Sequence, residues 1–381
     1  MPELSRRINS IIPSPISALM DRARGLAADG LPVIDLTVGE TGLPVPDEIK
    51  SEAIRAILLN QTGYTAAAGT AELRRKLGER YGVGPERVAV SNGAKTVVSS
   101  LLLALTDPGD EVLLPAPYWS CFREMIRVAG ASEVILPCNA ETNYLPTAET
   151  IRAACTGRTK AVIVNTPSNP AGTVCPAEMI REIAAFCSER GIWLIVDGSY
   201  DGLTYAGNAE NPLPLLSDSE RSVTVYVSSA SKTFAMSGWR IGWCVAAPSV
   251  VSALSRVFTN CTGNPSAIAQ AALLKGLKTY PAAPEQIRNE CRKRCGYVAE
   301  RVRKTGRLSC ADPEGGLYVF AELPRGTDDR SFSEQLLEGR NLAVVPGSAF
   351  GLPGHIRIAC THPLPVLKEA MDRLDSFLSS R

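Results

Sequence analysis

Residues 227–243 read VSSASKTFAMSGWRIGW, and this stretch places one lysine between an apolar, β-branched segment and an arginine. A lysine amine attacks an aldehyde only when it is deprotonated, and burial or a neighbouring cation lowers its pKa toward that state. Arg240 follows Lys232 closely and would supply such a cation, while its planar guanidinium also suits a phosphate group. The stretch therefore has the composition of a covalent cofactor anchor, although a lone lysine after a strand is more often an exposed residue.

The composition allows a large hydrophobic core, and the balance of charges gives no strong overall electrostatic field. The chain has 381 residues, 45% of them hydrophobic, and 40 basic residues balance 39 acidic ones. This balance gives no general attraction for nucleic acid or for an anionic membrane surface. The sequence shows neither a membrane-spanning apolar run nor the apolar core of a signal peptide, so we expect a cytoplasmic protein. Eleven cysteines without C-x-x-C pairs and two histidines indicate neither a disulfide framework nor a metal site.

Other segments place polar or aromatic residues where a ligand would be needed. Asp197 ends a fully apolar strand, and a buried carboxylate there requires a cation. Arg357 lies in the middle of an apolar strand and requires an anion. Gly93 stands in a turn before a helix, where unpaired amides and the helix dipole favour an anion such as phosphate. Trp119 follows a buried strand, at the edge where ligands collect in open α/β sheets.

The glycine turn at Gly93 does not fit nucleotide-binding patterns. It is not a G-x-G-x-x-G fingerprint, and no G-x-x-x-x-G-K-[ST] sequence occurs in the chain. Both absences weaken interpretations based on a dinucleotide or a nucleoside triphosphate.

Taken together, these segments resemble class I aminotransferases, which are fold-type I enzymes dependent on pyridoxal 5′-phosphate. The lysine stretch is similar to their S-x-S-K-x-x-x-x-x-G-W-R-x-G motif. Residues 63–74 resemble G-Y-x-x-x-x-G-x-x-x-L-R, and residues 165–172 resemble N-x-P-x-N-P-x-G. The resemblance runs in one order from Gly39 to Arg357, which is nearly the whole chain. Departures occur after Gly39, where residues 41–44 replace the usual proline, acid and aromatic, and at Gly198, which replaces a glutamate.

The resemblance implies a role for each residue of the site. Lys232 is the lysine that forms a Schiff base with the cofactor, Asp197 pairs with the pyridine nitrogen, and Trp119 stacks on the ring. Tyr200 and Asn169 donate to the ring oxygen. The other residues expected to bind the cofactor are Gly93, Ala94, Lys95, Ser229, Ser231, Arg240 and Tyr64. The residues expected to bind substrate are Gly39, Asn169 and Arg357, of which Arg357 holds the α-carboxylate.

Several of these roles have alternatives. The Tyr64 hydroxyl reaches the cofactor phosphate of the other subunit in the family, and a segment around Asn264 also resembles one that reaches the partner's site, which together imply a homodimer. A buried core tyrosine is the other possibility for Tyr64. Arg357 could instead form an internal salt bridge. Lys95 opposes the positive end of its helix dipole, so it could serve the phosphate, extend to solvent, or bind the distal carboxylate of aspartate or glutamate.

The fold expected from the resemblance is α/β, with a mostly parallel sheet in a large domain and a smaller α/β domain built from both termini. We expect an amino-terminal arm and part of the small domain over 1–46, the large cofactor domain over 47–284, and the carboxyl-terminal small domain over 285–381. Residues 31–40 read as a strand, and helices are expected from about 176 to 190 and from about 285 to 305. The bond between Asn169 and Pro170 is often cis in the family, and the sequence leaves its isomer open. The expected activity is transfer of an amino group between an amino acid and a 2-oxo acid through a Lys232 aldimine. A lyase or cyclase using the same cofactor is the alternative. A regulator without catalysis is disfavoured, because the chain has no appended DNA-binding helices or basic region.

Overall fold

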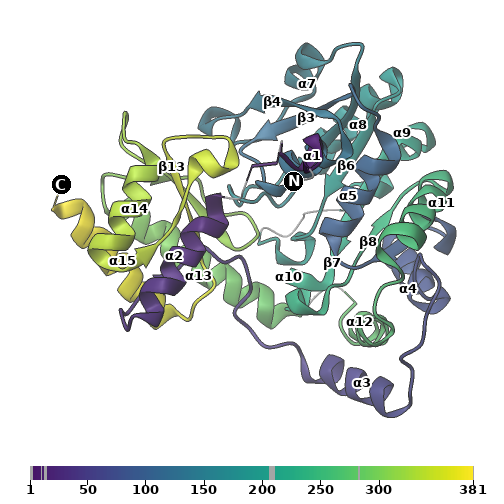
Figure 1. The fold of residues 1–381 in the computed structure, drawn as a ribbon, viewed down its shortest axis with the longest axis horizontal. Coiled ribbons are helices and arrows are strands. Elements are labelled where there is room, and N and C mark those ends of the chain that lie inside the picture. Colours follow the sequence, from purple (N-terminus) through teal and green to yellow (C-terminus); the bar gives the residue numbers. More distant parts are fainter. Residues whose placement is uncertain (1–2, 10, 13–14, 206–210, 282–283, 381) are drawn as a thin grey trace.

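A seven-stranded sheet forms the centre of the larger part of the molecule (Figure 1). The computed structural model describes residues 3–9, 11–12, 15–205, 211–281 and 284–380. In spatial order the strands are β2 (Val88–Ser91), β8 (Gly242–Val245), β7 (Thr224–Ser229), β6 (Trp193–Asp197), β5 (Thr159–Asn165), β3 (Glu111–Ala116) and β4 (Ser132–Pro137). Within this sheet β8 is antiparallel to both of its neighbours and the other pairs are parallel. The mostly parallel sheet confirms the predicted fold class.

Helices cover both faces of this sheet, which explains why its central strands are apolar along their whole length. Successive residues of one strand enter different cores, since Leu194 and Val196 belong to one and Ile195 to the other. The first core is completed by α4 (Ala71–Tyr81), α8 (Ala177–Arg190) and α12 (Ala267–Thr279). The second is completed by α5 (Ala94–Leu105), α6 (Cys121–Ala129) and α11 (Pro248–Val257).

Four further helices belong to this part of the chain. They are α3 (Asp47–Leu58), α7 (Ala148–Ala154), α9 (Asp218–Val223) and α10 (Ala230–Thr233). In Figure 1, α3 lies at the foot of the molecule, where it packs on α12.

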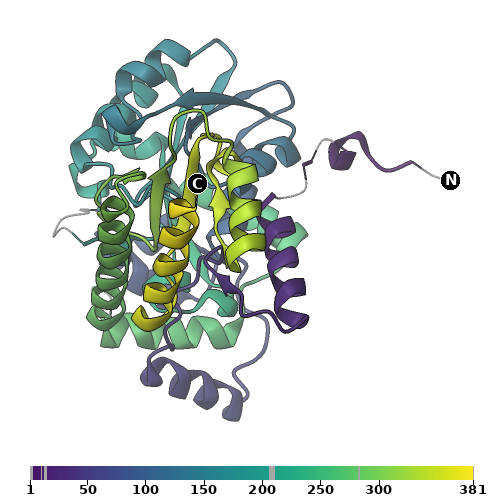
Figure 2. The ribbon, with the colours of Figure 1, turned by 90° about the vertical axis from the view of Figure 1, so that its left-hand side faces the viewer.

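The smaller part combines both ends of the chain. Its antiparallel sheet has the order β12 (Val345–Pro346), β13 (His355–Ala359), β10 (Tyr318–Glu322) and β9 (Ser309–Cys310), and β1 (Ile34–Asp35) pairs separately with β11 (Leu342–Ala343). Its main helices are α13 (Glu285–Lys304), α15 (Leu364–Ser379), α14 (Asp329–Arg340) and α2 (Pro15–Ala28). Figure 2 shows these four in a row, in that order, with the amino-terminal segment that carries α1 (Arg6–Asn9) reaching outward beside α2.

The first strand is shorter than the sequence indicated. The residues around 31–40 were expected to form a strand, but regular pairing covers only β1. Beyond it, Leu36 donates to the oxygen of Ala343 and accepts from the N–H of Ala359, both at 2.9 Å, and the N–H of Thr37 is bonded to the Asp35 carboxylate at 2.8 Å. The chain then continues as an extended segment that leads to Gly39.

We propose that the domain boundaries lie where the sequence analysis put them, at residues 46 and 284. All strands of the seven-stranded sheet fall between these two positions, and all strands of the smaller sheets fall outside them. Ile34 and Leu36 pack in the same core as residues of α13 and α15, which supports assigning the amino-terminal arm to the smaller domain.

The sequence indicated neither a membrane-spanning segment nor a disulfide framework. None of the helices in the described part of the chain has the length and apolar character of a membrane span. The eleven cysteines are free thiols, and Cys291 and Cys295 are buried packing residues of α13.

The parallel strands bring distant polar residues to one edge of the large sheet. Asn165 at the end of β5 is paired in register with Asp197 at the end of β6, and Asp197 with Val227 of β7. Directly after β7 the chain forms α10, which carries Lys232. These three strand ends therefore supply one wall of a common site.

Candidate active site

A cleft of about 500 Å³ lies at the carboxyl edge of β5, β6 and β7. Residues of both parts of the molecule line it, including Thr37 and Gly39 after β1, Tyr318 of β10 and Arg357 of β13. Every residue that the sequence analysis assigned to the site lines this cleft, except Gly93 and Tyr64. The fold thus brings together residues that are more than 300 positions apart in the sequence.

Lys232 points into the cleft from α10, and its Nζ donates to the backbone oxygen of Gly39 at 2.5 Å. Burial lowers the pKa of Lys232 to about 8; the carboxylate of Glu40 opposes this shift, and the cations Arg240 and Arg357 add to it. An appreciable fraction of this amine is therefore neutral near physiological pH, as a nucleophile or a base requires.

Gly39 is needed where it stands because another side chain occupies the adjacent space. A Cβ at this position would lie 1.9 Å from the hydroxyl of Tyr318. The glycine therefore lets the backbone approach both Lys232 and Tyr318 closely.

Asp197 is a buried carboxylate without a basic partner. Its side chain is 4% exposed, and no salt bridge to it is formed within the described ranges. Burial raises the pKa of Asp197 to about 6, against two hydrogen bonds from Ser199 that lower it. Such a group needs a cationic ligand to remain charged at low cost.

Asn165 ties Asp197 to the turn that carries Asn169. Its Nδ2 donates to the backbone oxygen of Asp197 at 2.9 Å, and its Oδ1 accepts the backbone N–H of Asn169 at 2.8 Å. The peptide bond between Asn169 and Pro170, whose isomer the sequence left open, is cis. Asn165 thus fixes the relative positions of two predicted ligand-binding residues.

Arg357 is a buried guanidinium that lacks an acidic partner among the described residues. Its Nη1 donates to Oδ1 of Asn169 at 3.0 Å, its Nη2 donates to the backbone oxygen of Thr37, and its Nε has no partner. The rings of Tyr318 and Phe350 lie 4.4 and 4.9 Å from its central carbon. No internal salt bridge to Arg357 forms within the described ranges, so its buried charge requires an anion in the cleft.

The start of α5 and Arg240 form a second place for an anion. A Cβ at Gly93 would lie 2.7 Å from Nη2 of Arg240, so this glycine leaves room for the guanidinium. The expectation that Gly93 offers a free backbone donor is wrong in this structure, because its N–H bonds the oxygen of Ser91 at 2.8 Å. The amides of Ala94 and Lys95 begin the helix without an acceptor in the described chain, and they suit a phosphate.

Lys95 and Trp119 meet at the rim of the cleft. The Nζ of Lys95 lies 5.1 Å from the centre of the Trp119 ring, a distance suited to a cation–π contact. Trp119 is partly buried and packs edge-on against Phe122, with ring centres 5.3 Å apart. The exposed Lys95 therefore borders the cleft and does not extend only into bulk solvent.

Sequence reasoning missed Tyr318, Asn165 and Ser199 as residues of the site. The hydroxyl of Tyr318 shares a hydrogen bond of 2.9 Å with that of Tyr200, and burial raises the pKa of Tyr200 well above its ordinary value. Asn165 could have been found, because it is the first asparagine of the N-x-P-x-N-P-x-G segment. Tyr318 gave no signal beyond an aromatic position in an apolar strand.

Tyr64 does not reach the cleft of its own chain. Its side chain is fully exposed, which makes the alternative of a core tyrosine wrong. Gln270 connects its loop to the segment around Asn264, since its Nε2 donates to Oγ1 of Thr65 at 3.0 Å and to the oxygen of Pro265 at 2.9 Å. The nearby helix α3 and the residue after it also expose large apolar side chains, which are Ile54, Ile57, Leu58 and Leu59.

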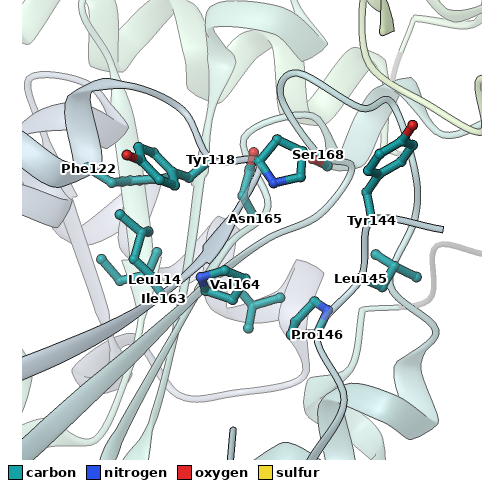
Figure 3. A pocket seen from close by; sticks show the side chains of 12 residues that line it. Leu114, Tyr118, Phe122, Tyr144, Leu145, Pro146, Ile163, Val164, Asn165 and Ser168 are labelled. Carbon is teal, nitrogen blue, oxygen red and sulfur yellow. The ribbon is translucent and has the colours of Figure 1, made fainter. Parts of the chain in front are cut away.

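A small cavity adjoins the cleft (Figure 3). It holds about 20 Å³, room for about one water molecule. Its walls are mostly apolar, with Leu114, Ile163 and Val164 among them, and Asn165 borders both this cavity and the cleft. It is too small for an amino acid, so the larger cleft is the candidate active site.

Comparisons with known proteins agree on one family. Residues 32–374 match the model of aminotransferase class I and II. The aspartate aminotransferase of Thermotoga maritima is 35% identical over 387 residues, covering 99% of this chain and all of the relative. The aspartate/prephenate aminotransferase of Thermus thermophilus is 35% identical over 380 residues, covering 97% of each chain. The solved structure of Thermus thermophilus aspartate aminotransferase with maleate superposes with a TM-score of 0.93 at 34% identity, covering 99% of this chain and all of that one.

Proposed function

Since the chain belongs to the class I and II aminotransferases, we propose that it holds pyridoxal 5′-phosphate on Lys232 and transfers the amino group of aspartate to a 2-oxo acid. Amino-group transfer is the activity predicted from the sequence, and the family generally uses this cofactor. One observation supports placing the cofactor and the amino-group transfer in this cleft. A lysine with a lowered pKa stands between a buried carboxylate that lacks a cation and a buried guanidinium that lacks an anion.

The residues present fit the cofactor. Asp197 is the carboxylate that a protonated ring nitrogen would neutralise, and the unused amides of α5 with Arg240 would hold the phosphate. Ser229 and Ser231 line the cleft beside Lys232. Trp119, Asn169 and Tyr200 would contact the ring and its oxygen. When bound, pyridoxal 5′-phosphate supplies an electron sink for the substrate's α-carbon and a carrier for the amino group.

The chain's own groups would orient the substrate and move the proton. Arg357 would hold the substrate's α-carboxylate. Its Nη1 donates to Oδ1 of Asn169 at 3.0 Å, and this bond orients the guanidinium. Gly39 and Tyr318 form the wall of the cleft beside Arg357. With a pKa of about 8, Nζ of Lys232 can remove the proton from the substrate's α-carbon and would deliver it to the aldehyde carbon of the cofactor within the same half-reaction. The second half-reaction would run these transfers in reverse.

Aspartate is the proposed amino donor because of Lys95 and the relatives. Besides Lys232, three basic side chains of the described chain line the cleft, namely Arg357, Arg240 and Lys95. The first two are assigned to the α-carboxylate and the phosphate, which leaves Lys95 for a distal carboxylate. The named relatives, which match over nearly the whole chain, are aspartate or aspartate/prephenate aminotransferases. Elimination or replacement chemistry, the alternative left open by the sequence, has no comparable support.

We further propose a homodimer in which Tyr64 serves the partner's cofactor phosphate. An exposed tyrosine next to an apolar helix face is typical of an interface between protein chains. Gln270 joins the Tyr64 loop to the segment around Asn264 through hydrogen bonds to Thr65 and Pro265, so both segments would belong to this interface. The cytoplasmic location inferred from the sequence remains a prediction.

The proposed function is tested by single-turnover product analysis. The purified holoprotein is mixed with one amino acid at a time, without any 2-oxo acid, and the products are identified by mass spectrometry. Aspartate should yield oxaloacetate in a stoichiometric half-reaction without ammonia release. Ammonia with pyruvate from serine or cysteine, whose β-substituent can leave, would indicate elimination, and a preference for an uncharged amino acid would reject aspartate as the donor.

A further inference from the structure

Ser199 makes the only side-chain hydrogen bond to the Asp197 carboxylate within the described residues. Its backbone N–H and its Oγ both reach Oδ1 of Asp197, at 3.0 and 2.6 Å. No donor of the described chain reaches Oδ2. Because Asp197 lines the cleft, Oδ2 is the oxygen left for a cationic ligand.

The turn that follows β6 fixes Ser199 in this position. The N–H of Gly198 donates to the oxygen of Val227 at 2.7 Å, and the N–H of Asp201 donates to the oxygen of Gly198 at 2.9 Å. A Cβ at Gly198 would lie 2.3 Å from the hydroxyl of Tyr226. The glycine that departs from the family pattern thus lets the chain pass Tyr226, and the Ser199 amide and hydroxyl both turn back to Asp197.

These contacts act on a carboxyl group that burial drives toward its neutral form. Burial raises the pKa of Asp197, and the two hydrogen bonds from Ser199 are the largest influences that lower it. A protonated Asp197 would not attract a protonated ring nitrogen. Loss of the Oγ donor would therefore weaken the charge on Asp197 and leave the Ser199 backbone N–H as the one described donor that holds its side chain.

We propose that Ser199 is a positioning residue for the transamination: its hydroxyl holds Oδ1 of Asp197, so that Oδ2 presents a negative charge to the ring nitrogen of the cofactor. This inference rests on the proposed function, because it assumes that pyridoxal 5′-phosphate occupies the cleft. It assigns to Ser199 no contact with substrate or cofactor.

The test compares Ser199→Ala, Ser199→Thr and, as a matched control, Ser222→Ala. The control removes the same hydroxyl from an exposed site whose only hydrogen bond in the described chain is to the oxygen of Ser219. Each protein is loaded with cofactor labelled with ¹⁵N at the ring nitrogen, and the nitrogen chemical shift is followed against pH. The cofactor dissociation constant, kcat and KM are measured on the same samples.

Ser199→Ala should lose ring-nitrogen protonation at a lower pH than wild type, and its kcat should fall about tenfold to a hundredfold, the effect of losing one hydrogen bond to a charged group. KM for aspartate and the cofactor dissociation constant should change less than threefold, because Arg357 and the phosphate contacts persist. Ser199→Thr keeps the hydroxyl and should restore the wild-type shift, and Ser222→Ala should equal wild type.

A wild-type nitrogen shift and kcat in Ser199→Ala would overturn the inference while leaving the proposed function intact. Failure of wild type itself to bind the cofactor would instead reject the proposed function. If Ser199→Ala does not fold, Ser199→Cys replaces it, since its weak donor should give a nitrogen shift and kcat between those of wild type and a protein without the bond. Equal behaviour of Ser199→Cys and wild type would also overturn the inference.

Discussion

Replacing Arg357 by glutamine should cost the enzyme more than any change at its surface arginines. The guanidinium has five N–H donors, and two of its nitrogens already donate to Asn169 and to the backbone of Thr37. Three of the five N–H donors therefore remain without an acceptor in the described chain, so the group can still hold a carboxylate through two bonds. Each hydrogen bond to a charged group contributes about 1.5–3 kcal/mol, so losing two costs about 3–6 kcal/mol. The expected fall in kcat/KM is therefore about 10²–10⁴-fold.

Steady-state kinetics with aspartate, alanine and phenylalanine measures this loss. The α-carboxylate is common to all amino acids, so kcat/KM should fall by a similar factor for each. The matched control is Arg301→Gln, because Arg301 is paired with Asp372 and Asp375 and lines no part of the cleft. Its kcat/KM should stay within about threefold of wild type. If kcat/KM of a folded Arg357→Gln falls less than tenfold, or falls for aspartate alone, Arg357 does not hold the α-carboxylate.

Three further predictions concern the dimer, the substrate and the lysine. Mixing Lys232→Ala with Tyr64→Ala subunits should restore one intact site per mixed dimer, and confirmed mixed dimers without activity would show that Tyr64 does not act across the interface. Lys95→Ala should cost aspartate about 1.5–3 kcal/mol more in kcat/KM than alanine, and equal losses for both would reject a distal-carboxylate role. In the apoprotein the folded state releases the Lys232 proton near pH 8 and the unfolded state near 10.5, so stability should rise by about 3 kcal/mol across that window. Chemical denaturation of wild type and Lys232→Met at several pH values checks this, since the variant should lack that rise.

Much of the fold was predictable because its long elements have strong patterns. The helices around residues 176–190 and 285–305 were expected within one residue of α8 and α13. Apolar runs that end in polar residues marked β5 and β6 and placed Asn169 and Asp197 near one edge. The strand expected around 31–40 is regular only over β1, and the Thr37 amide that follows bonds the neighbouring Asp35 carboxylate.

The contacts within the site were harder to predict because they join segments that are distant in the sequence. Tyr318 meets Tyr200 across 118 residues, and its place under Arg357 follows from how β10 pairs with β13. Ser199 is a local neighbour of Asp197, but its hydrogen bonds depend on the turn at Gly198. Sequence patterns predicted the residue types that carry charge, whereas the residues that orient them emerge only from packing.

Peptide mapping can identify the lysine that carries the cofactor. The holoprotein is reduced with borohydride and digested, and the peptide that carries the reduced pyridoxyl group is located by mass spectrometry. We expect the reduced pyridoxyl group on Lys232 alone, and none in Lys232→Ala treated in the same way. A reduced group on another lysine, such as Lys95, would contradict this expectation.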